Sequence, residues 1–252
     1  DVKYNKAMSN VGNGIEMYRS CKNKIRSNIF SNNTVGINLN DNSNNNYVFA
    51  NTLALNTRAG IALHLSTNNS VDGNTVSNNL DGILLQGCDD TKIRENHILN
   101  SNGAGISLQE HSGNTKRNEI IGNFVFNSSL GISISSSNNN WVTRNDIMHS
   151  LGTGLQLYDS TGNEIAGNYI QNSDGSGISL LNSDRNKIRC NTVANIFANT
   201  SIGINVTNSK TNEIYYNNFI ENAQQVCGNT LTENTWDDSK LYSCPVCMIK
   251  TG

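Results

Sequence analysis

Short stretches in which apolar and polar residues alternate recur along the whole 252-residue chain. One kind begins with Gly-Ile or Gly-Leu and has a second apolar residue two positions on, as in Ile37 and Leu39. Another kind is Asn-x-Ile-x-x-Asn, with a further apolar residue such as Ile98 two positions after its last Asn. Alternation over so few residues predicts short strands with one buried face. No apolar pattern has the period and length of an amphipathic helix.

These stretches return at a nearly constant interval. The Gly of the Gly-Ile or Gly-Leu pair stands at positions 14, 36, 60, 82, 105, 131, 154, 177 and 203. A whole unit that repeats about every 23 residues is typical of a solenoid. Three short strands per unit, joined by Asn, Ser and Gly, predict a single-domain right-handed parallel β-helix of about ten coils. Neighbouring strands are then expected roughly 4.8 Å apart.

The repeat places asparagine at the same corner of every coil. Asn adopts the left-handed backbone conformation of tight turns more readily than most residues, and its amide both donates and accepts hydrogen bonds. Stacked copies therefore predict a ladder of side-chain hydrogen bonds, like the Asn ladders of stacked strands. Proline would remove a donor, and the one proline, Pro245, follows the last repeat. The predicted ladder consists of Asn28, Asn51, Asn74, Asn96, Asn123, Asn145, Asn168, Asn191 and Asn217.

The repeats extend over residues 1–222, and residues 223–252 form a C-terminal closing segment. The 18 Lys and Arg residues nearly balance the 20 Asp and Glu residues and form no basic stripe, which argues against nucleic acid as a partner. No apolar run approaches the length of a membrane span. The four histidines fall on different coils with no shared column, so the sequence indicates neither a metal site nor a cofactor. The opening residues are those expected of a processed product or an excised fragment.

Six cysteines point to an oxidising, extracellular location. Cys21 and Cys88 lie in nearly the same column but three coils apart, which is roughly 14 Å at the strand spacing. A disulfide needs Cα atoms closer than about 7 Å, so these two are free or bonded to another molecule. The three cysteines after the repeats can form a disulfide, remain free or bind a metal. The disulfide candidates are Cys21, Cys88, Cys190, Cys227, Cys244 and Cys247.

Several Asn-x-Ser/Thr sequences are candidate sites of N-glycosylation, which occurs on exported proteins. In a chain so rich in asparagine, such sequences also arise by chance. One of them, at Asn205, lies inside an expected strand and is a poorer acceptor. The other candidate acceptors are Asn32, Asn68, Asn127 and Asn199.

The repeat resembles that of NosD-like periplasmic proteins and of archaeal, especially methanogen, surface proteins. In both, Asn-x-Ile-x-x-Asn stretches alternate with Gly-Ile-x-Leu. The stretch YYNNFIENAQQVCGNTLTENTWDDSKLYS at residues 215–243 is similar to the closing segment of that family. The resemblance implies a parallel β-helix and a role at the cell surface or with sugars, because carbohydrate-active enzymes share the coil. It implies no particular reaction.

One candidate catalytic cluster lies on the outward face beside the Asn motif. Successive coils bring Asp72 beside Arg94, and Glu95 and His97 follow in the same coil. A lyase would use the Arg or His on a uronate, and a hydrolase would need two carboxylates roughly 5–10 Å apart, which Asp72 and Glu95 can provide. The signature motifs of alginate epimerases and polygalacturonases are absent. A solvated ion pair without catalysis is the other interpretation.

The chain begins inside a coil, because residues 2–5 match the register of residues 25–28. An open coil exposes a strand edge, which head-to-tail stacking of subunits would cover. We therefore expect a non-catalytic, self-assembling cell-surface protein, such as an envelope or sheath subunit. It would partner with itself through coil ends or sides and be cross-linked through cysteines. A carbohydrate-active enzyme or glycan-binding module is the first alternative, and a NosD-like periplasmic accessory protein is the second.

Overall fold

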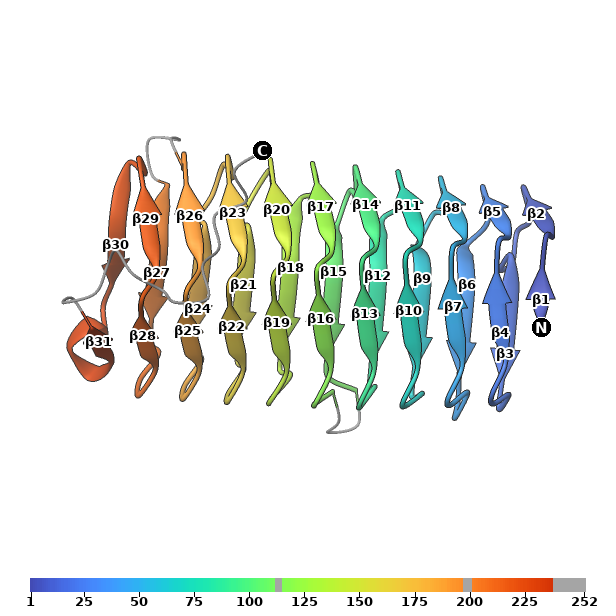
Figure 1. Ribbon diagram of the computed structural model, residues 1–252, viewed down its shortest axis with the longest axis horizontal. Coiled ribbons are helices and arrows are strands. Elements are labelled where there is room, and N and C mark those ends of the chain that lie inside the picture. The colour runs from blue at the N-terminus through green and yellow to red at the C-terminus, as the bar shows by residue number, and fades with distance from the viewer. Residues whose placement is uncertain (112–114, 197–200, 238–252) are drawn as a thin grey trace.

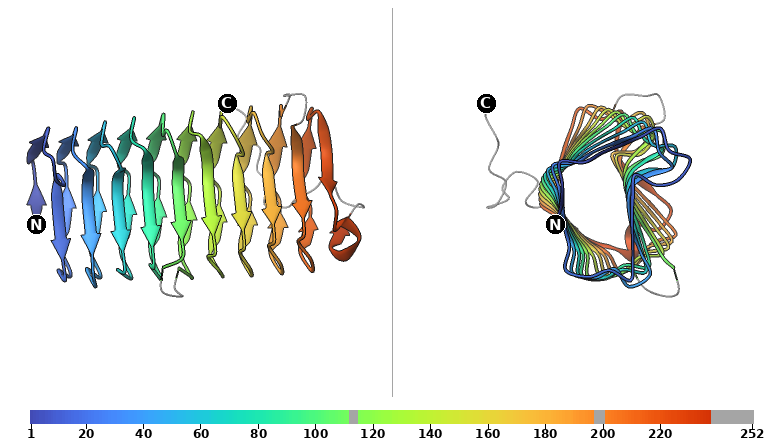
Figure 2. Two further views of the ribbon diagram at one scale, coloured as in Figure 1. Left: turned by 180° about the vertical axis from the view of Figure 1, so that it is seen from behind. Right: turned by 90° about the vertical axis from the view of Figure 1, so that its right-hand side faces the viewer.

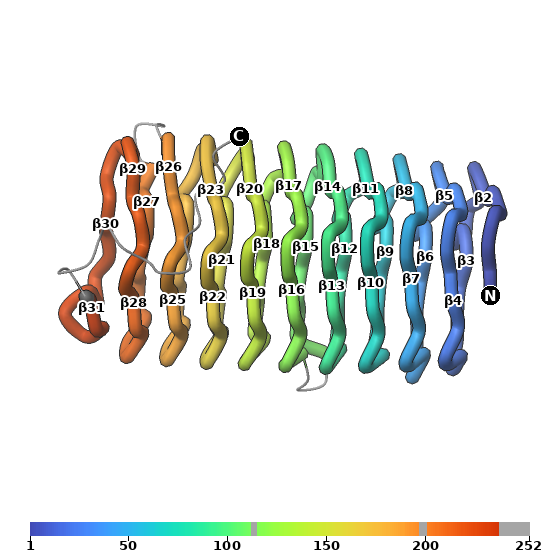
Figure 3. Tube along the Cα trace, viewed as in Figure 1, coloured from blue at the N-terminus to red at the C-terminus, as the bar shows by residue number. Residues whose placement is uncertain are grey.

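The computed structural model describes residues 1–111, 115–196 and 201–237. They form coils that stack along one axis, from the N-terminal coil at one end to β31 (Thr235–Asp237) at the other (Figures 1 and 3). In the end-on view of Figure 2, successive coils superpose around a common interior. Each strand pairs in parallel with the strand of the next coil. This arrangement confirms the single-domain parallel β-helix with three strands per coil.

Sheet A is built from the Asn-x-Ile-x-x-Asn stretches, with one strand from each coil. The middle residue of a three-residue strand is buried, and its two neighbours face outward, as in Lys24–Arg26. Its strands are β1 (Val2–Lys3), β4 (Lys24–Arg26), β7 (Tyr47–Phe49), β10 (Ser70–Asp72), β13 (Lys92–Arg94), β16 (Glu119–Ile121), β19 (Trp141–Thr143), β22 (Glu164–Ala166), β25 (Lys187–Arg189), β28 (Glu213–Tyr215) and β31.

Sheet B follows directly after the second Asn of each motif. Its strands are equally short, and again the middle residue points into the core, as Ile98 does. They are β2 (Lys6–Met8), β5 (Ile29–Ser31), β8 (Thr52–Ala54), β11 (Thr75–Ser77), β14 (His97–Leu99), β17 (Phe124–Phe126), β20 (Asp146–Met148), β23 (Tyr169–Gln171), β26 (Thr192–Ala194) and β29 (Asn218–Ile220).

Sheet C contains the Gly-Ile-x-Leu stretches. The glycine is required by close packing, because a Cβ on Gly105 would lie 2.8 Å from the carbonyl oxygen of Gly131 in the next coil. Its strands are β3 (Ile15–Tyr18), β6 (Val35–Asn40), β9 (Ala59–His64), β12 (Asp81–Gln86), β15 (Ala104–Gln109), β18 (Leu130–Ser135), β21 (Leu155–Tyr158), β24 (Ile178–Leu181), β27 (Ile202–Thr207) and β30 (Gln224–Gly228).

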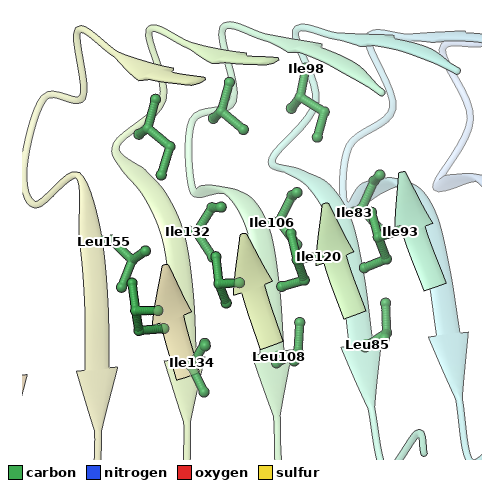
Figure 4. Packing of buried hydrophobic residues seen from close by; sticks show 14 of the residues in the cluster. Ile83, Leu85, Ile93, Ile98, Ile106, Leu108, Ile120, Ile132, Ile134 and Leu155 are labelled. Atoms are coloured by element: carbon green, nitrogen blue, oxygen red, sulfur yellow. The ribbon is translucent and has the colours of Figure 1, made fainter. Parts of the chain in front are cut away.

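The core consists of columns in which like side chains stack from coil to coil (Figure 4). Ile93 stands opposite Ile120 in sheet A, and Ile83 stands opposite Ile106 in sheet C. All four are fully buried. Burying one such side chain contributes about 1.5–3 kcal/mol, so each added coil extends the same apolar interior.

The nine predicted ladder asparagines lie at one buried corner between sheets A and B. Asn123 is typical: its Nδ2 donates to Oδ1 of Asn145 at 2.9 Å and to the carbonyl oxygen of Ile93 at 3.0 Å. Its Oδ1 accepts from both the backbone N–H and Nδ2 of Asn96, each at 3.0 Å. Each amide therefore pairs with the next amide and with backbone groups that the strands leave free.

The ladder asparagines are not the left-handed residues of this corner, in contrast to the reason that the sequence suggested for them. The residue before each one has the positive φ, for example 53° at Ala50 and 52° at Glu95. This residue turns the chain, which lets the following Asn direct its amide inward. Asparagine is needed here for hydrogen bonding rather than for backbone conformation.

Three further polar columns run along the other corners, and the sequence analysis missed them. In one, Asn46 accepts and donates between coils as Asn51 does. A second column holds asparagine in the earlier coils and serine in later ones. Several of these serine hydroxyls are buried and have no partner among the described residues. Parts of the three columns are Asn46, Asn69, Thr91, Asn118 and Asn140; Asn33, Asn56, Asn79, Ser101 and Ser128; and Ser43, Ser66, Cys88, Ser137 and Ser160.

Cys21 and Cys88 lie in nearly the same column, as the sequence indicates, but their one-residue offset gives them different environments. Cys88 takes the position of a serine and is fully buried, and burial raises the pKa of its thiol to about 12. Cys21 lies one residue beyond the serine column and is exposed, so only Cys21 of the two is accessible to another molecule. The free thiols of the described residues are Cys21, Cys88 and Cys227. Cys190 is not among them, and Cys244 and Cys247 lie outside the described residues.

The coil continues past residue 222. β30 pairs with β27, and β31 pairs with β28, so residues 223–237 extend sheets A and C. Between them lies a single 3-10 turn, η1 (Leu231–Glu233), whose Leu231 carbonyl accepts a hydrogen bond from Trp236 Nε1 at 2.8 Å. In the part of the chain that the structure describes, no helix is long and apolar enough to cross a bilayer.

The glycosylation candidates lie at corners where the structure describes them. Asn32, Asn68 and Asn127 all have φ near +54°, and Asn32 and Asn68 are exposed. Asn68 and Asn127 donate to asparagines of the preceding coil. Asn199 lies outside the described residues, and Asn205 lies within β27.

We predict that Asn123→Ala lowers the free energy of unfolding by about 1–3 kcal/mol, because it leaves buried partners of the amide unsatisfied. The measurement is urea-induced unfolding followed by circular dichroism. Asn205→Ala is the matched control, since this outward amide accepts one hydrogen bond, from Thr207 at 3.1 Å. Equal losses at the two positions would contradict the stabilising role of the ladder.

Candidate functional site

The outward side chains give the three sheets different chemical characters, and sheet A is ionic. Lys187 Nζ lies 3.4 Å from the carboxylate of Glu213, and Arg94 Nη2 lies 2.9 Å from that of Glu119. Exposed pairs of this kind contribute only about 0–1 kcal/mol, but they leave little uncompensated charge on the face. The other pairs on sheet A are Arg26–Asp1, Lys92–Glu119 and Arg189–Glu164.

Asp72 and Arg94 stand opposite one another in sheet A, as the sequence predicts, but each has another partner. Arg94 pairs with Glu119, and Oδ2 of Asp72 accepts a hydrogen bond from the hydroxyl of Ser70 at 2.8 Å. Partial burial raises the pKa of Asp72, against the opposing effects of Ser70 and Arg94. Its Oδ1 is buried without a partner among the described residues.

The other two predicted catalytic residues lie on different parts of the coil. Glu95 is the corner residue after β13, close enough for its charge to act on Asp72. His97 begins β14 in sheet B, where its ring centroid lies 5.7 Å from that of Phe124. The structure therefore brings Asp72, Arg94 and Glu95 together, and it places His97 on another face.

Sheet B carries an apolar patch made of Leu99, Phe124, Phe126 and Met148. These side chains are partly exposed and stand on three consecutive strands. The rings of Phe124 and Phe126 are nearly parallel, with centroids 6.2 Å apart, and His149 lies 5.1 Å from Phe126.

Sheet C is the uncharged face. From β6 to β27, the two outward positions that follow the Gly-Ile or Gly-Leu pair hold no Lys, Arg, Asp or Glu, and most hold amides or hydroxyls. One carboxylate, that of Asp81, stands at the start of β12, opposite Ala59. The residues at these positions are Asn38, Asn40, Ala62, His64, Leu84, Gln86, Ser107, Gln109, Ser133, Ser135, Gln156, Tyr158, Ser179, Leu181, Asn205 and Thr207.

A hollow of about 430 Å³ lies at the β6–β12 end of this face, within the range of roughly 300–1,000 Å³ typical of small-molecule sites. The small side chain of Ala62 forms part of its floor and packs in a buried cluster with Ala59 and Leu84. The hollow is lined by Asn38, Asn40, Arg58, Ala62, His64, Gln86 and His111.

The hollow brings together two histidines that the sequence analysis treated as unrelated. The ring centroids of His64 and His111 are 4.7 Å apart, although the residues come from coils that are not neighbours. Gly87 of the intervening coil makes this possible: its φ is +65°, and a Cβ there would lie 2.9 Å from the backbone oxygen of His111. The two histidines lie on different coils and in different columns, as the sequence indicates, but their contact does not follow from the repeat.

Hydrogen bonds hold the side chains of the hollow in place. His64 Nδ1 lies 3.0 Å from Oδ1 of Asn40, and Nδ2 of Asn40 donates to Glu16 at 3.5 Å. Because an amide oxygen only accepts, the neutral His64 carries its proton on Nδ1, which leaves Nε2 to bind a second proton. Arg58 Nη2 donates to Oε1 of Gln86, which also lines the hollow, at 3.1 Å.

The sequence matches a known family over most of its length. The family described as "Periplasmic copper-binding protein (NosD)" matches residues 4–151 and 111–244. The chain therefore belongs to the NosD family, as its repeat suggested. A comparison with curated protein sequences gives no match.

Several solved structures share the fold at low sequence identity. The A-module of the Azotobacter vinelandii mannuronan C-5 epimerase AlgE6 is 13% identical, with a TM-score of 0.70 over 93% of this chain and 78% of that one. The periplasmic alginate epimerase AlgG is 17% identical, with a TM-score of 0.54 over 77% and 61%. DFA-IIIase from Arthrobacter chlorophenolicus A6, in complex with GF2, is 15% identical, with a TM-score of 0.67 over 81% and 56%. At these identities the likeness establishes the fold alone.

We predict that His64 titrates below the value of about 6.5 of an unperturbed histidine. Its partial withdrawal from water lowers its pKa, and the neighbouring His111 and Arg58 lower it further, against a smaller opposite effect of Asp41. His111→Gln and Arg58→Gln should each raise the pKa of His64, as measured by NMR titration of the ring protons. The control Arg144→Gln removes a positive charge from a corner between sheets A and B. The same shift in this control would contradict the local effect.

Proposed function

We propose that this NosD-family protein binds an extended glycan along the outward face of sheet C. The observation that carries the proposal is the double row of uncharged, mostly hydrogen-bonding side chains on that face, with the hollow at one end. On sheet A, many of the equivalent positions hold ion pairs. The uncharged row is therefore a property of one face and not of the repeat itself.

The chemistry of this row suits sugar hydroxyl groups, which both donate and accept hydrogen bonds. Asn and Gln amides and Ser and Thr hydroxyls do the same. Because strands repeat roughly every 4.8 Å along the axis, the face offers similar groups at regular intervals to a chain molecule. Tyr158 adds a ring that is apolar on its faces and polar at its hydroxyl, which suits the mixed character of a sugar ring.

The comparisons support a ligand of this class. Two of the similar structures are named as epimerases of mannuronan and alginate, and a third is DFA-IIIase with GF2. The family is described as periplasmic, and we propose that the protein acts outside the cytoplasm, at the cell surface or in the periplasm. Glycans are plentiful in both places.

We propose binding rather than turnover, because no described cluster supplies a complete catalytic set. On sheet A, the cation of Arg94 is compensated by Glu119, and His97 faces away with sheet B. The carboxylates of Asp72 and Glu95 remain the best candidates for a hydrolytic pair, since general acid catalysis needs a raised pKa like that of Asp72.

Copper is part of the family description. Whether this chain could bind copper depends on which ligand atoms it brings together. Among the described residues, no three His, Cys, Asp or Glu side chains lie close enough to share an ion. The hollow offers two imidazoles, and Nδ1 of His64 is already bonded to Asn40. This set does not fit the nitrogen-rich or sulfur-containing sites that proteins use for copper.

A second proposal is the self-assembling envelope subunit that the sequence favours. The apolar patch on sheet B supports it, because exposed apolar side chains gathered on one face are typical of contact surfaces. The exposed thiol of Cys21 also supports it, since an accessible thiol can link two chains in an oxidising compartment. Packing through sheet B would leave sheet C free, so the two proposals are compatible.

We predict that Ser133→Trp weakens glycan binding at least about tenfold, because the indole would stand in the middle of the uncharged row. The measurement is a glycan array with the wild-type protein, followed by calorimetric titration of the best ligand. Thr143→Trp is the matched control, since this residue is also partly buried and faces outward, but from sheet A. Failure of every glycan to bind, or equal loss in both variants, would overturn the proposal.

For self-assembly, we predict a disulfide-linked dimer on non-reducing gels that reductant converts to a 27.5 kDa monomer. Cys21→Ser should abolish the dimer. Cys88→Ser should not, because Cys88 is fully buried and a serine fits its place in the serine column. A wild-type protein that stays monomeric under oxidising conditions, with Cys21 free, would contradict this.

A further inference from the structure

Arg58 is an unusual cation on the uncharged face. The other guanidinium groups near this end of the molecule, those of Arg19 and Arg26, form ion pairs with Asp41 and Asp1 at 2.7 and 3.0 Å. No carboxylate of the described residues lies within ion-pair distance of Arg58. Its side chain is exposed at the edge of the hollow.

A chain of amides orients this guanidinium. Arg58 donates to Oε1 of Gln86, Gln86 Nε2 donates to Oε1 of Gln109 at 3.0 Å, and Gln109 Nε2 donates to the hydroxyl of Ser107 at 3.0 Å. The first two bonds cross from coil to coil along sheet C and the third lies within β15, and each acceptor residue is the next donor, so the bonds polarise one another. The chain uses one N–H group of Arg58, and the remaining donors of its planar fork are available for an oxyanion.

Three carboxylates near the hollow already have partners. Glu16 accepts from the amides of Asn13, Asn38 and Asn40. Asp41 forms an ion pair with Arg19. The pKa of Asp41 lies below its usual range, mainly because of the hydrogen bond from the Tyr18 hydroxyl and also because of Arg19. Asp81 accepts from the backbone N–H of Ala104 at 2.9 Å.

Two imidazoles also line the hollow. His64 and His111 lie against one another, and both line the same space as Arg58. A protonated imidazole carries a positive charge, and both of its ring nitrogens donate hydrogen bonds. The hollow thus holds one permanent cation, two groups able to become cations, and several amide donors.

We infer that this hollow is an anion subsite, which binds the oxyanion substituent of an acidic sugar through Arg58, His64 and His111. The inference rests on the proposed glycan-binding function and names the class of glycan: one whose residues carry a carboxylate or a sulfate. The sugar hydroxyls lie on the amide and hydroxyl row of sheet C, and the charged group enters the hollow at its end.

The test compares glycans that differ in charge alone. Oligogalacturonate and its methyl ester share one backbone, as do a sulfated galactan oligosaccharide and its desulfated form. For the wild type, we expect the charged member of one pair to bind with a Kd at least about tenfold lower than its neutral counterpart. Which pair shows this difference identifies the bound group as a carboxylate or a sulfate. Arg58→Gln should bring that ratio close to one, chiefly by raising the Kd of the charged member. Arg144→Gln, with the same change in net charge, should keep the preference.

A second measurement separates the subsite from the proposed function. Titration of the protein with inorganic sulfate and with galacturonate monosaccharide should shift the NMR signals of Arg58 Nε–H and of the His64 ring. Shifts without any oligosaccharide binding would uphold the subsite and refute the glycan function. Glycan binding that is indifferent to charge and to Arg58→Gln, or no shift with either anion, would refute the subsite.

Discussion

The fold depends above all on the hydrogen bonds that asparagine side chains make at the corners of the coil. A chain that turns between short strands leaves backbone groups outside the sheets, and buried groups without partners are costly. Asn168 illustrates the solution: its backbone N–H and Nδ2 both reach Oδ1 of Asn191, at 3.0 and 2.9 Å. Its Nδ2 also donates to the carbonyl oxygen of Val142 at 2.9 Å. One side chain thus serves two coils, and the apolar columns can stack in register.

Because the hydrogen bonds and apolar contacts that stabilise the fold are interior, the outward side chains are free to vary. Because the amide ladders and the apolar columns hold each coil to the next, the outward positions can vary without loss of the fold. The three sheets use that freedom differently: sheet A carries ion pairs such as Arg94–Glu119, sheet B an apolar patch around Phe124 and Phe126, and sheet C an uncharged row. A function assigned to one face therefore requires nothing from the other two.

The sequence predicts the features that the repeat imposes and misses those that depend on three-dimensional proximity. The fold and the pairing of Asp72 with Arg94 follow from periodicity, since residues one period apart become neighbours. The repeat does not show on which sheet a side chain lies: a corner separates His97 from Arg94 and turns His97 onto another sheet. The repeat also does not show contacts between different columns, such as that of His64 with His111. This contact depends on a coil longer than its neighbours and on the missing side chain of Gly87, which no column of the repeat records.

The position of the hollow also restricts where the proposed glycan binds. Sheet C is nearly uniform from β15 to β27, so a neutral chain would find equivalent hydrogen-bonding groups at many registers along it. A single cationic end at Arg58 reduces that degeneracy for an acidic chain, because only registers in which the chain reaches the hollow place a charged residue beside the guanidinium. The amide chain from Ser107 to Arg58 strengthens this effect, as it holds the guanidinium at the hollow before a ligand arrives. On this view the uncharged row supplies contact length, and Arg58 favours the registers in which an acidic glycan reaches the hollow.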